Sequence, residues 1–257
     1  MDSIQLKARL SEKQPVIGTW SHIPNIQVVE IIGASGFDFI IFDMEHGPHS
    51  YTEMPGLYCA AESSGLVPFI RVPAMESSSV LRSLDSGAKG VVFPHVDGAA
   101  KAEACLQSLR YGNTPSSRGI ATLTRSSMFD YEHEKEHIAS QNDKIVSVLL
   151  LEDKGGLDEL DRICDLEGLD VVFVGIYDLS QSLGFKGGLD DPGFKKVFAD
   201  SVKRIRDKGA AVGCYTPSPE GARSLVDMGI TFITINVDGG MLRRAYQTAA
   251  QQIADIR

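Results

Sequence analysis

The strongest constraint on the fold of this chain is a regular alternation of short apolar runs with segments of helical character. Several runs are apolar at consecutive positions, as expected of parallel strands covered on both faces. The eight runs span residues 16–20, 38–43, 67–72, 89–94, 145–152, 170–175, 210–215 and 231–236. Helical patterns lie between them, and they include residues 24–35, 77–88, 98–110, 218–229 and an amphipathic C-terminal segment.

This alternation indicates an α/β fold. Eight strands, each followed by a helix, fit the 257 residues of the chain, because a (β/α)8 TIM barrel typically needs about 250 residues. We therefore predict one (β/α)8 barrel domain over residues 1–257. A doubly wound sheet built from the same elements is the main alternative. The irregular stretch 111–143 exceeds the usual βα loop and predicts an active-site or subunit-contact excursion.

The composition is that of a globular protein, with 43% hydrophobic and 23% charged residues. The formal net charge of −9 argues against binding to nucleic acid or to anionic membranes, which requires a basic surface. The N-terminus lacks an apolar signal region, and no run reaches the length of a membrane span. We expect a soluble cytoplasmic protein. Its four cysteines have no CxxC spacing, which favours buried free thiols over disulfides.

Polar residues occur at the ends of several predicted strands. They are unexpected there, because the strands themselves are buried apolar runs. In a barrel the carboxyl ends of the strands form one rim, and chemistry takes place there. The residues concerned are Trp20, Asp43, Glu45, His46, Arg71, His95, Glu152 and Asp178. Each has a structural alternative, since an aspartate can cap a helix and a glutamate can pair with a neighbouring Lys or Arg. Together, Arg71, Glu152 and Asp178 favour a site for a metal and an anion.

The types of these residues restrict the chemistry. Two carboxylates, with no cysteine and no close histidine pair, suit a hard octahedral cation such as Mg²⁺, Mn²⁺ or Co²⁺. His46 is the best candidate for a general base, because its acidic neighbours can orient it. His22 is close to the rim by sequence and can line the mouth. His95 follows the fourth strand and can contact the substrate, but the preferred interpretation is a loop histidine with satisfied hydrogen bonds. Lys89 begins a strand, on the opposite rim, which disfavours a Schiff-base mechanism.

Several motifs resemble the HpcH/HpaI aldolase family of metal-dependent, class II pyruvate aldolases. The segments that carry the resemblance are FDFIIFDMEHGPHS, FIRVPA, LRSLDSGAKGVVFPHV, LLLED and VFVGIYDLSQSLG. It runs from about residue 5 to residue 250, in order and at consistent spacing. The family includes 4-hydroxy-2-oxoheptanedioate and 2-dehydro-3-deoxyglucarate aldolases, and the resemblance implies the same barrel.

The resemblance implies a role for each matching residue. Glu152 and Asp178 match the metal ligands, Arg71 matches the arginine that stabilises the pyruvate enolate, and Trp20 matches a residue at the mouth. Main-chain N–H groups of the family's G-x-x-D loop hold the pyruvate carboxylate. That loop is formed here by Gly175, Ile176, Tyr177 and Asp178.

The resemblance also implies a base system and an assembly. His46 matches the histidine of the base system, with Asp43 beside it, and Asp85 matches an aspartate that reaches this histidine from a neighbouring subunit. Family members are usually hexamers, arranged as trimers of dimers that exchange the last helix. The amphipathic C-terminus of this chain permits such an exchange.

The predicted function is reversible cleavage of a 4-hydroxy-2-oxo acid to pyruvate, or a related keto acid, plus an aldehyde. One alternative keeps the enolate but uses a thioester acceptor, as in a Claisen-type synthase that forms citrate for siderophore assembly. Another is a keto-acid-binding protein without turnover. The chain departs from the family pattern at three places: Leu150 replaces a frequent Gln, Ile176 replaces the Pro of a G-P-x-D loop, and the arginine-glycine loop reads NTPSSRG.

Overall fold

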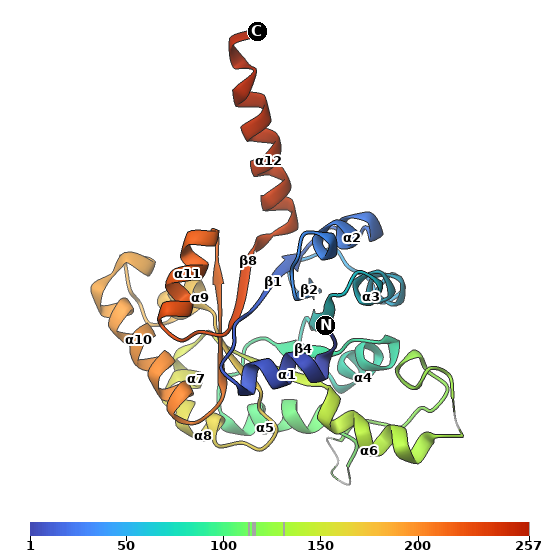
Figure 1. Ribbon diagram of the computed structural model, residues 1–257. Coiled ribbons are helices and arrows are strands. Elements are labelled where there is room, and N and C mark those ends of the chain that lie inside the picture. Colours follow the sequence, from blue (N-terminus) through green and yellow to red (C-terminus); the bar gives the residue numbers. More distant parts are fainter. Residues whose placement is uncertain (113, 115–116, 131, 257) are drawn as a thin grey trace.

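In the computed structural model, which describes residues 1–112, 114, 117–130 and 132–256, eight parallel strands close into a barrel (Figure 1). The strands follow each other around the barrel in sequence order, and β8 pairs with β1. This confirms the (β/α)8 prediction and excludes the doubly wound sheet. Every strand boundary lies within one residue of its prediction: β1 Val16–Ser21, β2 Phe39–Asp43, β3 Val67–Arg71, β4 Gly90–Phe93, β5 Val146–Leu151, β6 Val171–Val174, β7 Ala211–Thr216 and β8 Phe232–Val237.

Ten helices surround the barrel in the described part of the chain, and one more covers the amino-terminal end of its strands. The surrounding helices are α2 Ile26–Ala34, α3 Met54–Ser63, α4 Ser77–Ser86, α5 Ala99–Ser108, α6 Glu134–Lys144, α7 Lys154–Asp158, α8 Leu160–Cys164, α9 Ile176–Ser182, α10 Pro192–Asp207 and α11 Pro219–Asp227. An additional helix, α1 Ser3–Ser11, precedes the first strand and was not anticipated. Its Leu6 and Leu10 are buried in the same cluster as the barrel interior. This helix therefore closes the amino-terminal end of the barrel and leaves the opposite rim open.

The barrel interior is filled by phenylalanines that need glycine neighbours. Phe39 stacks on Phe232 at a centroid distance of 4.1 Å, and Phe69 meets both rings edge-on at 5.4 Å. A Cβ atom on Gly18 would lie 2.3 Å from the Phe39 ring, and one on Gly90 would lie 2.2 Å from the Phe69 ring. Large and small residues thus alternate across the core, and each buried phenylalanine contributes about 2 kcal/mol through the hydrophobic effect.

The long connection between α5 and β5 contains the short η1 Arg125–Ser127 and helix α6, which account for much of the predicted irregular stretch. This loop exposes several apolar side chains: Ile120, Leu123, Met128 and Phe129. Among the cysteines, Cys105, Cys164 and Cys214 are buried free thiols as predicted, whereas the free thiol of Cys59 is exposed on α3. In the described part of the chain, no helix has both the length and the apolarity to cross a membrane.

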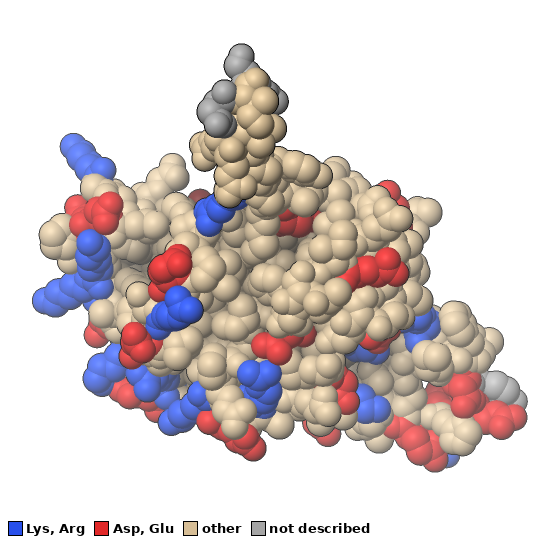
Figure 2. Space-filling model, turned by 45° about the horizontal axis from the view of Figure 1, so that its top comes forward, with Lys and Arg blue, Asp and Glu red and all other residues tan. Residues whose placement is uncertain are grey.

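The last helix, α12 Asp238–Gln252, stands away from the barrel (Figure 1). Asp238, its first residue, is buried, but the large apolar side chains of Leu242, Tyr246 and the following Ile253 are exposed. Figure 2 shows that the outer part of this projection carries almost no charge on the visible face. An isolated helix of this length is marginal in water unless an apolar face is packed.

The packing of the barrel interior leads to a stability prediction. Replacement of Gly90 by alanine places a methyl group on the Phe69 ring, so we expect the free energy of unfolding to fall by about 1–3 kcal/mol. Urea unfolding of Gly56→Ala provides the matched control, since a Cβ there meets only Ile26 at 3.8 Å. Equal urea midpoints for wild type and Gly90→Ala would contradict this description of the core.

Candidate active site

The open rim of the barrel contains a pocket of about 210 Å³. It is formed by residues from the ends of most of the strands, and these include both titratable and aromatic side chains. Its lining consists of Trp20, His22, Asp43, Arg71, Leu150, Glu152, Phe173, Gly175, Ile176, Tyr177, Asp178, Tyr215 and Val237. Five of the eight residues that the sequence placed at strand ends therefore line one pocket at this rim: Trp20, Asp43, Arg71, Glu152 and Asp178.

Asp43 is the most buried charged residue of the pocket, with an exposed fraction of 0%. The register of β2 and β3 places Asp43 directly beside Arg71, and Arg71 Nε donates to Asp43 Oδ1 at 2.9 Å. The N–H groups of Glu45 and His46 also donate to Oδ1, and His22 Nε2 lies 2.7 Å from Oδ2. Burial alone would raise the pKa of Asp43, but the Arg71 guanidinium and these hydrogen bonds lower it to about 2. Asp43 is therefore an ionised carboxylate that also closes the turn after its strand.

Arg71 is held on all sides. Its guanidinium carbon lies 4.6 Å above the ring of Trp20, and its Nη1 lies 3.1 Å from Glu45 Oε2. Trp20 in turn donates from Nε1 to Thr234 Oγ1 at 2.9 Å and packs edge-on against Phe173. A fixed guanidinium at the floor of a pocket is suited to bind an anionic or enolate oxygen.

Glu152 is paired with a histidine instead of a lysine or arginine. His95 Nδ1 lies 3.0 Å from Glu152 Oε1, and the His95 backbone N–H donates to the same oxygen. His95 Nε2 also lies 2.8 Å from Glu45 Oε1, and His95 adopts a left-handed backbone with φ of 56°. The reading of His95 as a satisfied loop histidine is thus confirmed. Burial, together with the negative charges of Glu45 and Asp178, raises the pKa of Glu152 despite the hydrogen bond from His95.

These carboxylates fit a divalent cation by their chemistry. Glu152 has an exposed fraction of only 6%, and it shares the pocket with Asp178. Two carboxylates in one pocket repel each other, and a cation bound between them would remove this repulsion. Carboxylate oxygens are ligands that suit Mg²⁺ or Mn²⁺. Within the described residues there is no group of three or more Asp, Glu, His or Cys arranged as a metal site. The protein would thus supply two ligands, and water or substrate oxygens would complete the coordination.

The loop after β6 brings Asp178 and Glu152 together. The N–H of Gly175 donates to the carbonyl of Leu151 at 3.0 Å, and α9 begins at the next residue. A Cβ on Gly175 would lie 3.0 Å from the Cβ of Glu152 and 3.5 Å from its Oε2. Glycine is therefore needed here so that the two strand ends can approach closely.

Two of the predicted catalytic residues, His46 and Asp85, are not among those that line the pocket. His46 gives its backbone N–H to Asp43, but its side chain is exposed and no described residue is within hydrogen-bonding distance of its ring. Asp85 lies on α4 and accepts a hydrogen bond from Arg118 Nη2 at 2.6 Å, and the Arg118 guanidinium stacks over Tyr111. The structure thus brings together the two carboxylates predicted to bind a metal, the arginine and the loop residues, and it places Asp85 in a separate ion pair.

The sequence did not single out the apolar half of the pocket. Phe173, Tyr215 and Val237 line it together with Leu150 and Tyr177, and the rings of Tyr177 and Tyr215 are 6.1 Å apart. Phe173 and Val237 belong to strands whose apolar residues gave no sign of facing a cavity. Only the alternation of inward and outward side chains near a strand end, once the barrel is known, could have found them.

A model of the HpcH/HpaI aldolase/citrate lyase family matches residues 16–245 of this chain. The chain belongs to the HpcH/HpaI aldolase/citrate lyase family. It is 32% identical over 246 residues to the 5-keto-4-deoxy-D-glucarate aldolase of Escherichia coli, covering 96% of this chain and 95% of that protein. It is accordingly an enzyme of the aldolase type, a carbon–carbon lyase.

Solved structures agree with this assignment. The crystal structure of an HpcH/HpaI aldolase/citrate lyase family protein from Burkholderia cenocepacia superimposes with a TM-score of 0.91 at 29% identity, covering 97% of this chain and 99% of that chain. The citrate synthase SbnG gives a TM-score of 0.83 at 26% identity, with 97% and 98% of the two chains covered. A family protein and a citrate synthase of known structure therefore both resemble this chain over nearly its whole length.

The ion pair of Asp43 leads to a pH-dependent prediction. Its folded pKa of about 2 lies below the ordinary value of 3.8, so the ionised carboxylate stabilises the native state above about pH 4, and this contribution is lost as the pH falls toward 2. We expect Asp43→Asn to lower the free energy of unfolding by about 2 kcal/mol near neutral pH. Urea unfolding should show the gap between wild type and variant narrowing below about pH 4. A gap of the same size near pH 6 and near pH 2.5 would contradict this.

Proposed function

We propose that this enzyme reversibly cleaves a 4-hydroxy-2-oxo acid into pyruvate, or a related keto acid, and an aldehyde with the help of a divalent metal ion. The observation that supports this most directly is the shared pocket of Arg71, Glu152 and Asp178. A guanidinium in the same pocket as two carboxylates, of which Glu152 has its pKa raised by burial and by nearby negative charge, is a combination that an ion-pair network of purely structural purpose does not require.

The balance of charge in the site supports a role for a metal ion. Asp43, Glu45, Glu152 and Asp178 carry four carboxylates, against the single guanidinium of Arg71. A keto acid would bring a further negative charge, so the protein alone would repel it. A divalent cation held by Glu152 and Asp178 would supply the positive charge that attracts the keto acid and stabilises negative charge on the keto oxygen.

The residues of the chain itself account for binding and for stabilisation of the enolate. In the loop 175–178 the N–H of Gly175 already donates to Leu151, so the N–H groups of residues 176–178, at the start of α9, are proposed to hold the substrate carboxylate. Arg71 would donate to the keto oxygen, because each of its two terminal nitrogens has a second N–H besides the one used by Asp43 or Glu45. Trp20 keeps the guanidinium in place from below. A preorganised donor of this kind contributes several kcal/mol to the lowering of a barrier.

Cleavage also needs a base that removes the proton of the C4 hydroxyl. The sequence assigns this role to His46 in partnership with Asp43, and this assignment stays a prediction. The low pKa of Asp43 keeps its carboxylate ionised, so it can orient an imidazole and stabilise its protonated form. No lysine is among the residues that line the pocket, which agrees with an enolate mechanism in preference to a Schiff base.

The citrate synthase SbnG is also similar to this chain, and this favours a second candidate function. In that case the same enolate would attack a thioester, and the product would be a citrate-type acid with release of a thiol. The acceptor would in either case contact the apolar wall of Leu150, Phe173, Tyr177, Tyr215 and Val237. This wall offers no Lys or Arg that would bind a carboxylate on the aldehyde. The test panel should therefore include neutral aldehydes as well as aldehydes that carry a carboxylate.

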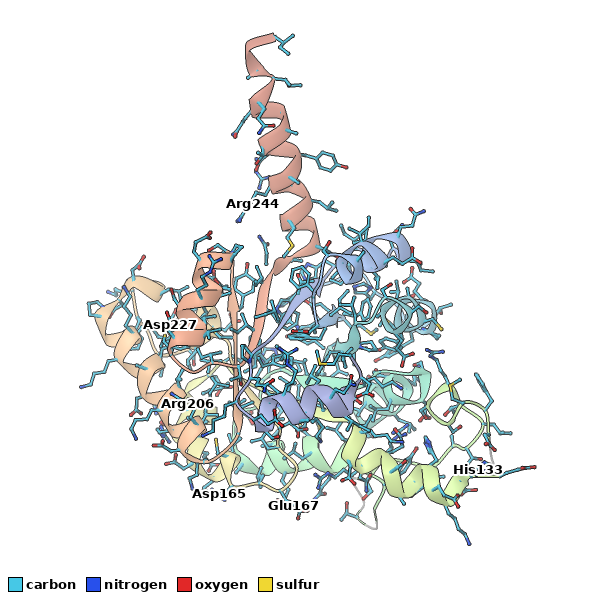
Figure 3. The ribbon with its side chains drawn as sticks, in the orientation of Figure 1. His133, Asp165, Glu167, Arg206, Asp227 and Arg244 are labelled. Atoms are coloured by element: carbon cyan, nitrogen blue, oxygen red, sulfur yellow. The ribbon has the colours of Figure 1, made fainter. Side chains whose placement is uncertain are left out.

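We further propose that the active form is a homo-oligomer, a hexamer built as a trimer of dimers that exchange α12. The helix projects from the barrel with its apolar face exposed (Figures 1 and 2). Near its base, Arg244 donates to the carbonyl of Pro217 at 3.2 Å, and Figure 3 shows Arg244 pointing to one side of the helix. In such an assembly, Asp85 would approach the active site of a neighbouring subunit.

The metal proposal is tested by chelation and by two variants. Protein stripped with EDTA should release no pyruvate from a panel of 4-hydroxy-2-oxo acids, and Mg²⁺, Mn²⁺ or Co²⁺ should restore the release. Glu152→Gln and Asp178→Asn should each lower kcat/KM more than about 100-fold, since a ligand contributes at least as much as its outer-shell partners. The matched control is Glu167→Gln, whose side chain is 97% exposed (Figure 3).

Several outcomes would decide between the candidate functions. Release of free thiol from acetyl-CoA and oxaloacetate, without pyruvate release from any hydroxy keto acid, would identify the Claisen-type synthase. Pyruvate release that survives chelation would contradict the metal-dependent mechanism. No turnover on either panel would indicate the keto-acid-binding protein.

The assembly proposal is tested by light scattering coupled to size-exclusion chromatography. The double variant Leu242→Glu/Tyr246→Glu adds charge to the exposed apolar face of α12, so the hexamer should dissociate into smaller species. Gln247→Glu adds a charge to the polar face of the same helix and should leave the mass unchanged. A wild-type protein that elutes as a monomer would refute the exchange of α12.

A further inference from the structure

We infer that His95 is a positioning residue, which orients the carboxylate of Glu152 for binding of the divalent cation. This inference rests on the proposed metal-dependent cleavage and names a residue that prepares its metal ligand. His95 follows β4 and is not among the residues that line the pocket. Its role is therefore exerted through Glu152 and not through contact with the substrate.

His95 holds one oxygen of Glu152 in two ways. Its backbone N–H donates to Glu152 Oε1, and its ring nitrogen Nδ1 lies 3.0 Å from the same oxygen. The other oxygen, Oε2, faces the loop after β6, since a Cβ on Gly175 would lie 3.5 Å from it. That loop leads to Asp178, the second carboxylate of the pocket. The two contacts with Oε1 therefore leave Oε2 directed toward the side on which Asp178 lies.

The backbone contact depends on the left-handed conformation of His95. Its φ of 56° lies in a region that residues other than glycine seldom adopt, although asparagine, aspartate and histidine do so more often than the rest. With this conformation the chain turns directly after β4, and the N–H of His95 donates across to the end of β5. A residue that disfavours the left-handed region would therefore move the donor away from Glu152.

The segment that carries His95 packs tightly against the chain that follows Glu152. The strands that precede these two segments, β4 and β5, are neighbours in the barrel. Beyond the strands, a Cβ on Gly156 would lie 2.5 Å from the carbonyl oxygen of Val96. This close backbone contact keeps the donor and the acceptor in a fixed relation.

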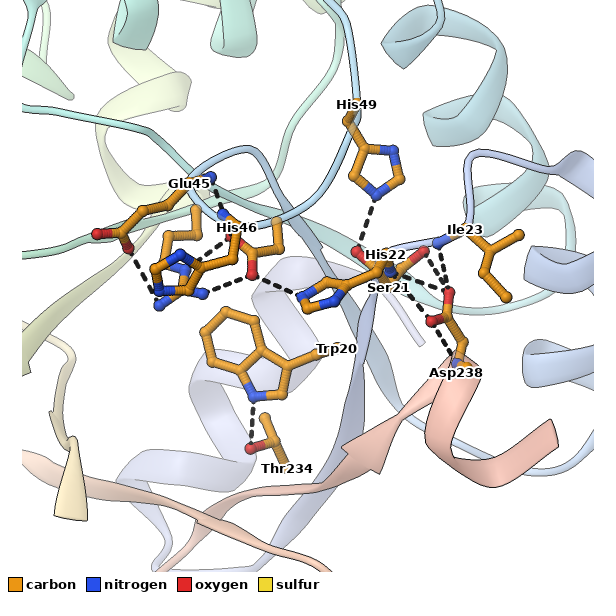
Figure 4. A network of polar contacts seen from close by, with 12 residues as sticks. Trp20, Ser21, His22, Ile23, Glu45, His46, His49, Thr234 and Asp238 are labelled. Atoms are coloured by element: carbon orange, nitrogen blue, oxygen red, sulfur yellow. Dashed lines mark hydrogen bonds and ion pairs between the residues drawn. The ribbon is translucent and has the colours of Figure 1, made fainter. Parts of the chain in front are cut away.

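The ring of His95 is anchored at its second nitrogen as well. His95 Nε2 lies 2.8 Å from Glu45 Oε1, and Glu45 Oε2 lies 3.1 Å from Arg71 Nη1 (Figure 4). The imidazole is 64% exposed, whereas the carboxylates of Glu45 and Glu152 are 12% and 6% exposed. The ring thus links the carboxylate proposed to bind the cation with the carboxylate that pairs with the guanidinium.

A positioning role and a merely stabilising role predict different results. If the contacts of His95 only stabilise its loop, replacement of His95 lowers the free energy of unfolding and leaves the affinity for metal unchanged. If they orient Glu152, the affinity for metal falls, because the partners of a metal ligand typically contribute about 10- to 100-fold to metal affinity.

The experiment measures the Kd of Mn²⁺ for the full-length protein from the paramagnetic resonance signal of free Mn²⁺, with a thermal melt of each variant. His95→Asn tolerates the left-handed backbone and keeps an N–H donor close to the place of Nδ1. His95→Gly keeps the backbone conformation but removes the ring. His95→Val removes the ring and disfavours the left-handed backbone.

Lys13→Val is the matched control. Lys13 is exposed, has a φ of 59° and lies between α1 and β1, at the opposite end of the barrel from the pocket. The substitution imposes the same unfavourable backbone conformation on valine, far from Glu152. It should lower the melting temperature and leave the Kd of Mn²⁺ unchanged.

We expect the Kd of Mn²⁺ to rise about 10-fold in His95→Gly and about 100-fold in His95→Val, the two ends of the range for partners of a metal ligand. His95→Asn should stay closer to wild type than either. Wild-type affinity in both His95→Gly and His95→Val would overturn the inference. If His95→Val does not fold, a wild-type Kd in His95→Gly is sufficient to overturn it.

Failure of this inference can be distinguished from failure of the proposed function. Glu152→Gln is the reference, since it removes the proposed ligand itself. A wild-type protein that binds no Mn²⁺, or binds it no more tightly than Glu152→Gln does, would refute the proposed metal site. Weaker binding by Glu152→Gln, next to wild-type affinity in the His95 variants, would refute only the role of His95.

Discussion

The site depends on a single buried ion pair, the one between Asp43 and Arg71. These residues are direct neighbours in the register of β2 and β3, and both lie at the open rim of the barrel. A carboxylate without exposed surface is costly unless it is paired and hydrogen-bonded, and Asp43 is bonded to two side chains and two backbone N–H groups. This arrangement fixes the guanidinium over Trp20 and fixes the ring of His22, so the same residue positions the anion-binding group and a histidine that lines the pocket.

The other half of the site has the opposite character. Glu152 is buried beside further negative charge, and among the described residues its ion-pair partner is His95. The guanidinium in the pocket lining, that of Arg71, is paired with Asp43 and Glu45. Glu152 and Asp178 are therefore left with an excess of negative charge, which suits a divalent cation. The carboxylates therefore have separate roles. Asp43 positions Arg71 and His22, while Glu152 and Asp178 remain available as oxygen ligands.

Much of this could be read from the sequence, because the strands are long apolar runs and polar residues at their ends must converge once the barrel closes. Glu152, Asp178, Arg71 and Trp20 were predictable for that reason. The histidine partner of Asp43 could not be predicted. His22 and His46 are both near the rim, and only the register of β1 and β2 shows which ring contacts the carboxylate. The contact between Glu152 and His95 depends on the left-handed backbone conformation of His95, which no sequence pattern predicts.

The central claim is that the pocket binds a keto acid through a cation held by Glu152 and Asp178, and the fluorescence of Trp20 tests it most directly. Pyruvate should change this fluorescence in a saturable manner when Mg²⁺ or Mn²⁺ is present, and EDTA should abolish the change. Identical pyruvate titrations with metal and with EDTA would contradict the claim, because the guanidinium alone would then suffice for binding.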